Sequence, residues 1–190
     1  MNVKKRMLSI VLSGAMAVST AVSAGSFSAF AVAQCVAYSG SNVNDQDYVQ
    51  WSDTVKSYLT VCDNGNYMRV QSGAIEGKLL VEYYSSDFEP LSTKLIDNEL
   101  PIFGAFYDSG NNYYVLSGQE NPKQNDSLEV FRITKYDKNW NKIKSCGLYG
   151  ANTTVPFDAG SARMTHSGDH LLVRTCHEMY KSSDGNNHQA

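Results

Sequence analysis

A repeated order of polar turn, strand-like run and aromatic corner constrains the fold of this chain more than any other feature. The three turns lie at offsets of 45 and 58 residues and are Asn64-Gly65, Ser109-Gly110 and Ser167-Gly168. After the first turn, Leu79–Tyr84 closes on Asp87-Phe88, and after the second, Glu129–Tyr136 closes on Asp137-x-x-Trp140. One such unit cannot bury its own apolar face, so a period of about 40–50 residues predicts units that stack side by side.

Short runs of strand-forming residues separated by turns predict four strands in each of the first two units. In the first unit these are Tyr58–Cys62, Tyr67–Val70, Lys78–Tyr84 and Leu91–Ile96. In the second unit they are Ile102–Tyr107, Tyr113–Ser117, Glu129–Tyr136 and Lys142–Cys146. A third unit begins with Gly160–Thr165 and His170–Cys176 and is incomplete at Ala190. The fold class is therefore all-β, with about two and a half four-stranded antiparallel units.

The units can be aligned residue by residue. Three pairs lie 52 residues apart and are expected to be equivalent: Tyr84 with Tyr136, Phe88 with Trp140, and Leu91 with Ile143. If each unit packs against the next, equivalent apolar residues of the second strands should have related environments. These residues are Met68, Leu116 and Leu172.

The first 33 residues have the layout of a secretory signal peptide. A basic start at Lys4, Lys5 and Arg6 precedes an apolar stretch over residues 7–22. Small-residue cleavage sites end at Ala24, Ala31 and Ala33, of which the last two are preferred. The alternative is a membrane anchor, but a spanning helix needs roughly 20 strongly apolar residues. We expect a secreted, extracellular protein whose residues 34–57 form an irregular lead-in or a short helix.

Charge narrows the choice of partners. Loss of residues 1–33 takes the formal charge from −3 to −6 and leaves no basic stripe. Nucleic acid and anionic membrane surfaces need clustered Lys and Arg, so neither is an expected partner. The mature chain of about 157 residues is long enough for one domain with a core.

Cysteine usage predicts the redox state. The cysteines are Cys35, Cys62, Cys146 and Cys176. In an exported chain this even number permits two disulfides in three possible connectivities, and we expect at least one; buried free thiols are the alternative. The wide spacing fits no zinc site. The sequence therefore predicts no metal and no cofactor.

Units of four strands and this length resemble the blades of a β-propeller over residues 58–190. Segments 118–122, 156–160, 177–180 and 184–190 also resemble parts of uncharacterised secreted propeller-like proteins of Gram-positive bacteria. The resemblance implies a repeat domain that is truncated at its C-terminus, because a propeller normally closes with four or more blades. The remaining blades of a longer chain would then be its first partner. The resemblance brings no known activity.

Candidate site residues follow from the same alignment. Glu120 and Glu178 match when residues 176–178 are aligned on residues 118–120, and a propeller would place both near its channel. With His177 and Arg163 nearby, they would allow acid–base chemistry or polyol binding. The preferred alternative is that each carboxylate accepts hydrogen bonds from its own loop. The sequence contains no nucleophile elbow, phosphate loop or His-Glu-x-x-His motif.

Aromatic-rich strands without these signatures favour a secreted, non-catalytic binding or scaffolding module whose ligand is a carbohydrate or a protein. One alternative is a propeller-type glycan hydrolase, lyase or transferase that uses the four candidate residues. Another is a fragment with no autonomous function, whose missing blades complete the channel.

Overall fold

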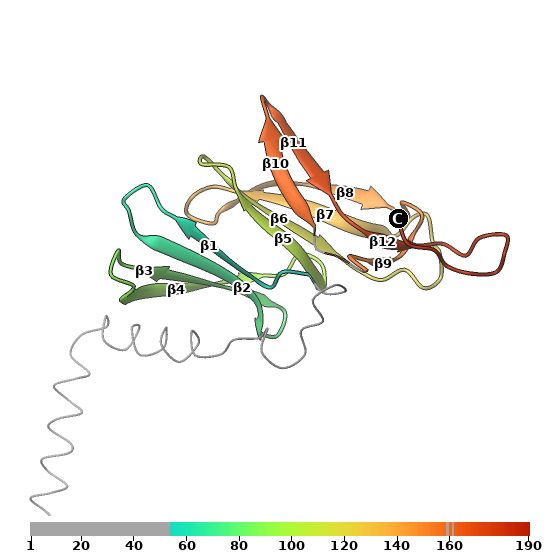
Figure 1. The fold of residues 1–190 in the computed structure, drawn as a ribbon, viewed down its shortest axis with the longest axis horizontal. Helices are drawn as coiled ribbons and strands as arrows, with labels where there is room; N and C mark the ends of the chain where they lie inside the picture. The colour runs from blue at the N-terminus through green and yellow to red at the C-terminus, as the bar shows by residue number, and fades with distance from the viewer. Residues whose placement is uncertain (1–53, 159, 161) are drawn as a thin grey trace, which may run out of the picture.

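The computed structural model describes residues 54–158, 160 and 162–190, and in this part of the chain every regular element is a β-strand (Figure 1). The strands are β1 (Ser57–Val61), β2 (Tyr67–Ile75), β3 (Lys78–Tyr84), β4 (Pro90–Asp97), β5 (Ile102–Asp108), β6 (Tyr113–Gly118), β7 (Glu129–Tyr136), β8 (Lys142–Tyr149), β9 (Thr153–Pro156), β10 (Arg163–Ser167), β11 (His170–Arg174) and β12 (His177–Met179). No helix in the described ranges has the length and apolar character needed to cross a membrane.

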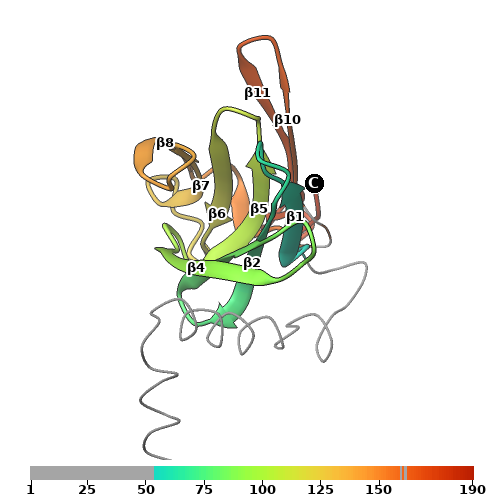
Figure 2. The same cartoon turned by 90° about the vertical axis from the view of Figure 1, so that its left-hand side faces the viewer.

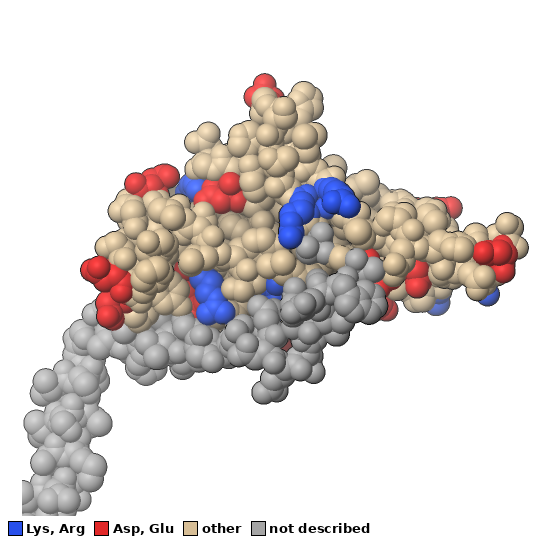
Figure 3. All heavy atoms as spheres, in the orientation of Figure 1, with Lys and Arg blue, Asp and Glu red and all other residues tan. Residues whose placement is uncertain are grey.

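Two four-stranded antiparallel sheets form the body, with strand orders β1-β2-β3-β4 and β5-β6-β7-β8. We call them the first and second sheets. The hairpin β10–β11 projects from this body, as Figures 2 and 3 show. The predicted all-β class and the four-stranded antiparallel units are confirmed; a closed ring of blades is not seen.

The strands predicted for the first two units are all present, and Lys78–Tyr84 and Glu129–Tyr136 match residue for residue. The largest differences are that β2 continues to Ile75 and β8 continues to Tyr149. The strand predicted over Tyr58–Cys62 is present as β1, one residue earlier at each end. The predicted signal peptide, its cleavage sites and most of the lead-in lie outside the described residues.

The two aromatic corners have the same backbone geometry. Phe88 and Trp140 both have a φ of 63°, in the left-handed region. Each donates its N–H to the carbonyl three residues earlier, on Ser85 and Asp137, at 3.0 Å. The Ser85 hydroxyl and the Asp137 carboxylate also accept hydrogen bonds from the backbone N–H groups two and four positions later, which stabilises the turn. The predicted offset of 52 residues is confirmed at this corner.

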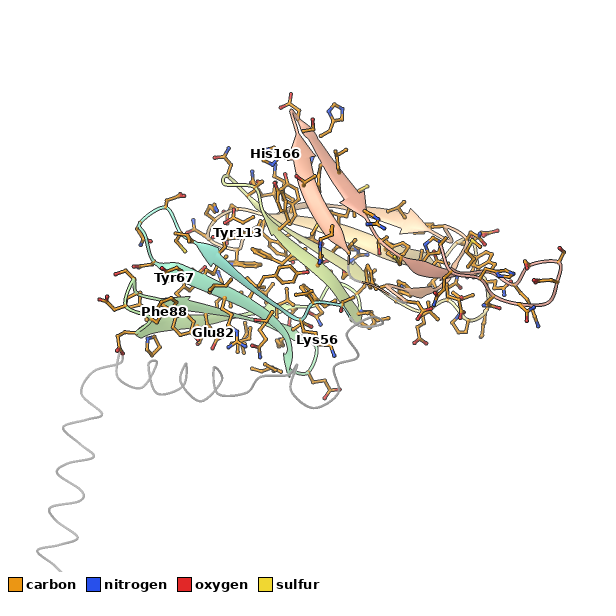
Figure 4. The ribbon with its side chains drawn as sticks, viewed as in Figure 1. Lys56, Tyr67, Glu82, Phe88, Tyr113 and His166 are labelled. Atoms are coloured by element: carbon orange, nitrogen blue, oxygen red, sulfur yellow. The ribbon has the colours of Figure 1, made fainter. Side chains whose placement is uncertain are left out.

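The corners differ in what covers them. Trp140 is buried between the two sheets, where its ring packs against that of Tyr113 at a centroid distance of 4.8 Å. Phe88 stacks on Tyr67 in the first sheet at 4.4 Å but is 60% exposed. Figure 4 shows Tyr113 between the sheets and Phe88 at the far edge of the first sheet. Each corner residue thus packs against another aromatic ring, but of the two only Trp140 is part of the hydrophobic core.

The main core lies between the facing sides of the two sheets. The first sheet contributes Met68, Val70, Leu79, Val81 and Ile96, and the second contributes Phe103, Phe106, Tyr113, Val115, Tyr136 and Trp140. A second cluster lies on the opposite side of the second sheet and comprises Ala105, Leu116, Val130, Phe131, Phe157 and Ala162. The units therefore stack in chain order, because the second sheet packs against the first on one side and against the third unit on the other.

The third unit is one long hairpin interrupted in the middle. Strand β9 pairs with β12, and β10 pairs with β11, so both ladders join the same two chain segments. Residues 157–162 separate β9 from β10, and the Phe157 N–H donates to the Cys176 carbonyl between the two ladders. After a loop, Ala190 exchanges two backbone hydrogen bonds with His177, and Gln189 forms an isolated antiparallel bridge with Glu178 of β12.

The prediction for this unit needs correction. Strand β10 starts at Arg163 instead of residue 160, β11 ends at Arg174 instead of residue 176, and both β9 and β12 were missed. The missed strands have four and three residues, too few to show a period of two.

The three second-strand residues lie on equivalent sides of their units. Met68 and Leu116 are fully buried against the unit that follows each of them. Leu172 lies on the side of the hairpin opposite to Val173, which faces the second sheet, and it is 51% exposed. The three side chains therefore have the related orientation that was expected. The expectation is wrong for their burial, because no described segment covers the side of the hairpin on which Leu172 lies.

The expected disulfide is not seen among the described cysteines. Cys62, Cys146 and Cys176 are free thiols. Cys62 follows β1, Cys146 lies on the edge strand β8, and Cys176 lies between β11 and β12. The fold thus distributes them over three separate units. Cys35 lies outside the described residues.

Candidate functional site

The two candidate carboxylates have different surroundings. Glu120 is exposed in the loop after β6, whereas Glu178 lies on β12. Strand β9 contacts both segments: its Thr154 carbonyl accepts the N–H of Asn121, and its Thr154 hydroxyl donates to Glu178 Oε1 at 2.6 Å. Both segments thus lie beside β9, and of the two carboxylates Glu178 is the one that accepts a hydrogen bond from it.

Glu178 is held by donors from its own neighbourhood. Its Oε1 accepts hydrogen bonds from the Thr154 hydroxyl and from the Asn187 amide, the latter at 2.8 Å. These contacts connect β9, β12 and the loop that leads to the last residues. The two hydrogen bonds therefore stabilise the position of this loop.

Arg163 begins β10 and lies directly opposite Arg174 in the β10–β11 ladder. Its Nη1 donates to the Ala162 carbonyl at 3.1 Å. In Figure 3 basic side chains gather at the foot of the hairpin, where β10 begins and β11 ends. Two like charges opposite each other on a ladder are unfavourable by themselves.

His177 is the one of the four candidates that lines a cavity next to the hairpin. Its ring lies 6.3 Å from that of Phe131 in an edge-to-face arrangement. Burial lowers the pKa of the imidazole, because desolvation disfavours the charged form. His177 and Glu178 are adjacent on a strand and point to opposite sides, so they do not act as a pair.

The shifted pKa of His177 predicts a pH effect on stability. The unfolded chain binds the proton more readily than the folded chain, so the contribution of His177 is fully present above the unfolded value of about 6.5 and is lost as the pH falls below it. We expect the melting temperature of the wild type to fall more between about pH 7.5 and about pH 5.5 than that of His177→Gln. Parallel curves for the two proteins would contradict this assignment.

A groove runs between the hairpin and the second sheet. Its inner part has a volume of about 510 Å³ and is apolar, lined among others by Leu116, Phe131, Ile133, Leu148, Val173 and His177. Its outer part has a volume of about 440 Å³ and is lined among others by Tyr114, Ile133, Lys135, Lys144, Asp169 and Leu171. Ile133 borders both parts, so they form one continuous surface.

Two contacts fix the hairpin over this groove. Tyr107 on β5 hydrogen-bonds to His166 on β10, and Phe157 fills the space beside Gly104 and Gly118 of the second sheet. The ladder pairs Met164 with Val173 and His166 with Leu171. Leu171 and Val173 therefore share the side of the hairpin that faces the second sheet.

One side of the groove is an unpaired strand edge. Strand β11 pairs with β10 on one edge, and its other edge pairs with no described strand. Along β12 the corresponding edge pairs antiparallel with the last residues through His177 and Ala190. A free edge of this kind offers N–H and C=O groups to another strand.

Sequence reasoning did not find the groove residues. Alternation along β7 places Ile133 and Lys135 on one side of that strand, but nothing local to β7 shows that β11 lies opposite. The groove depends on the hairpin contact between Tyr107 and His166, which lie 59 residues apart.

Comparison with known proteins identifies no relative: no family model, curated protein or solved structure matches this chain. Within residues 54–158, 160 and 162–190, no three His, Cys, Asp or Glu side chains are grouped as metal ligands would be.

Proposed function

We propose that this chain is a secreted, non-catalytic module that binds a protein partner in the groove between the hairpin β10–β11 and the second sheet. The architecture that we propose is a partial β-propeller, in which the two four-stranded sheets are blades and the hairpin begins a third. Stacking in chain order and the shared aromatic corner support this proposal.

The groove is the observation that carries the proposed function. It combines an apolar floor with a free strand edge, and polypeptides are recognised by this combination, because main-chain hydrogen bonds supply affinity and side-chain pockets supply specificity. The aromatic rings of Tyr113 and Trp140 are buried in the core, so these two rings are not available to stack on a sugar.

A matched pair of surface substitutions tests the proposal. Leu148 on β8 lines the groove and is 47% exposed, whereas Leu91 on β4 is 44% exposed and lies in the first sheet. We expect Leu148→Asp to weaken capture of an extracellular protein partner by on the order of tenfold or more, because a charge would be placed on the apolar floor. Leu91→Asp should leave capture unchanged.

The measurement is a pull-down from culture medium and cell-surface extract with the secreted wild type and both variants, quantified for each retained protein. Equal capture by Leu148→Asp and the wild type would contradict a binding role for the groove. Turnover of a glycan by the wild type that is lost in Glu178→Gln would favour the enzymatic alternative.

A further inference from the structure

We propose that the groove is occupied by an extended segment of the partner, which adds as a strand to the free edge of β11 and carries an acidic residue two positions after an apolar one. This inference rests on the proposed function and specifies its ligand. It is carried by the direction of the free edge, the register of the hairpin and the charges on the groove wall.

The direction follows from the last residues of the chain. Ala190 and His177 exchange N–H to C=O hydrogen bonds of 2.9 Å in each direction, and Met179 donates to the carbonyl of His188 at 2.7 Å. This short antiparallel pairing occupies the edge of β12 that continues into the free edge of β11. A strand that extends it along β11 would likewise run antiparallel to β11, as all neighbouring strands of the described sheets do.

The register decides which side chains of the added strand enter the groove. Leu171 and Val173 face the second sheet, so the residues placed opposite them on the added strand would face it too. An antiparallel strand reaches Val173 first and Leu171 two residues later. Its inward side chains are therefore read in that order.

The two positions differ in chemistry. Val173 lies in the inner part of the groove, where most of the lining is apolar, as at Phe131 and Leu148, and Arg174 is also present. Leu171 lies in the outer part, where Lys135 and Lys144 from β7 and β8 outnumber the single carboxylate of Asp169. Lys135 and Lys144 are cross-strand neighbours, so their two positive charges lie on the same side of the second sheet, in the outer part of the groove. An apolar side chain fits the first position and a carboxylate fits the second.

Charge argues against two edge strands of a second copy as the occupant. The edge strands of the two sheets are β1, β4, β5 and β8, and of these β4 and β8 carry lysines, whereas β1 and β5 carry none. Strand β4 contributes Lys94 and β8 contributes Lys142 and Lys144. A like-charged edge in this place would add positive charge beside Lys135.

The test is fluorescence anisotropy of labelled synthetic peptides with the secreted protein. The first peptide is Ser-Thr-Val-Thr-Glu-Thr-Ser, and the second exchanges Val and Glu. We expect the first to bind on the order of tenfold more tightly, because only its order matches the groove in an antiparallel strand. N-methylation of alternate residues on the edge that faces β11 should abolish binding, because it removes the ladder hydrogen bonds.

Charge reversal controls for misfolding. The double variant Lys135→Glu with Lys144→Glu should lose the first peptide and gain a peptide in which Lys replaces Glu. Lys123→Glu is the matched control, since Lys123 is exposed in the loop between β6 and β7 and does not line the groove. Recovery of binding by the Lys peptide shows that the double variant is folded.

Three outcomes would overturn the inference. The first is equal binding of the two peptide orders, the second is undiminished binding of the N-methylated peptide, and the third is a dimer in sedimentation that Leu148→Asp dissociates, which would identify a second copy as the occupant. If Leu148→Asp abolishes partner capture while the peptides show no preference, the strand-addition inference fails and the proposed function stands. If Leu148→Asp changes nothing, the proposed function itself fails.

Discussion

Replacement of Trp140 by Ala is expected to destabilise the protein by about 3–5 kcal/mol. The Trp140 side chain is 4% exposed and packs against the rings of Phe106, Tyr113 and Tyr136 at centroid distances of 5.8, 4.8 and 5.5 Å. Its indole N–H also donates to the Tyr83 hydroxyl of the first sheet at 3.1 Å. Truncation would open a cavity between the two sheets and leave the hydroxyl without this donor.

The repeat supplies the control. Phe88→Ala removes an aromatic ring from the same corner at the same φ of 63°, so the backbone effect of the substitution is matched. Because Phe88 is exposed and stacks only on Tyr67 among the described rings, we expect a loss of about 0.5–1 kcal/mol. Denaturant unfolding of both variants measures the difference. Similar losses for the two would show that the corners are energetically equivalent and that Trp140 does not hold the sheets together.

Gly104→Ala is expected to destabilise the protein by about 1–3 kcal/mol through overpacking. A Cβ at residue 104 would collide with the ring of Phe157, which is 3% exposed and packs edge-to-face on Phe131. Gly118 approaches the same ring, with 2.9 Å between its ideal Cβ position and Phe157 Cε2. Glycine at 104 therefore allows the third unit to pack closely on the second sheet.

A double-mutant cycle separates this contact from general damage to β5. Phe157→Ala alone should cost about 3–5 kcal/mol, and addition of Gly104→Ala in that background should cost little more, because the ring that the new methyl group meets is gone. Denaturation midpoints of the two single variants, the double variant and the wild type give the coupling. Additive losses would show that residue 104 is sensitive for a reason other than Phe157.

The same contact bears on the groove. Phe157 lies between the second sheet and the hairpin, together with Ala162 at the start of the hairpin. A displaced Phe157 would move the base of β10 and with it the orientation of β11. Gly104→Ala should therefore weaken peptide binding as well as stability, whereas Trp140→Ala should act mainly on stability, since Trp140 lies on the far side of the second sheet.

Some strands could be predicted closely because their pattern is local. Glu129–Tyr136 ends at a corner where Asp137 accepts hydrogen bonds from residues two and four positions later, so the end of the strand is set by nearby side chains. The equivalence of Phe88 and Trp140 was predicted for the same reason. Their different burial was not, because it depends on which sheet faces each corner.

The candidate site shows the opposite case. Alignment of residues 176–178 on 118–120 treats two segments as equivalent, but β9 inserts against both, and β9 was not predicted. Glu178 consequently bonds to Thr154, which is 24 residues away, and Glu120 stays in an exposed loop. Short strands of three or four residues are specified by their partners, and local sequence carries little of that information.

By itself, the sequence determined the positions of most strands and turns in this protein, and it showed that the same turn recurs at Phe88 and Trp140. These features depend on backbone preferences and on side chains that bond to their own neighbours. Only the tertiary structure decided which repeated positions are core and which are surface, and that β11 lies across from β7 and β8 to form a groove. Burial and grooves arise between segments far apart in the chain, and the contact of Tyr107 with His166, which joins the hairpin to the second sheet, has no local signature.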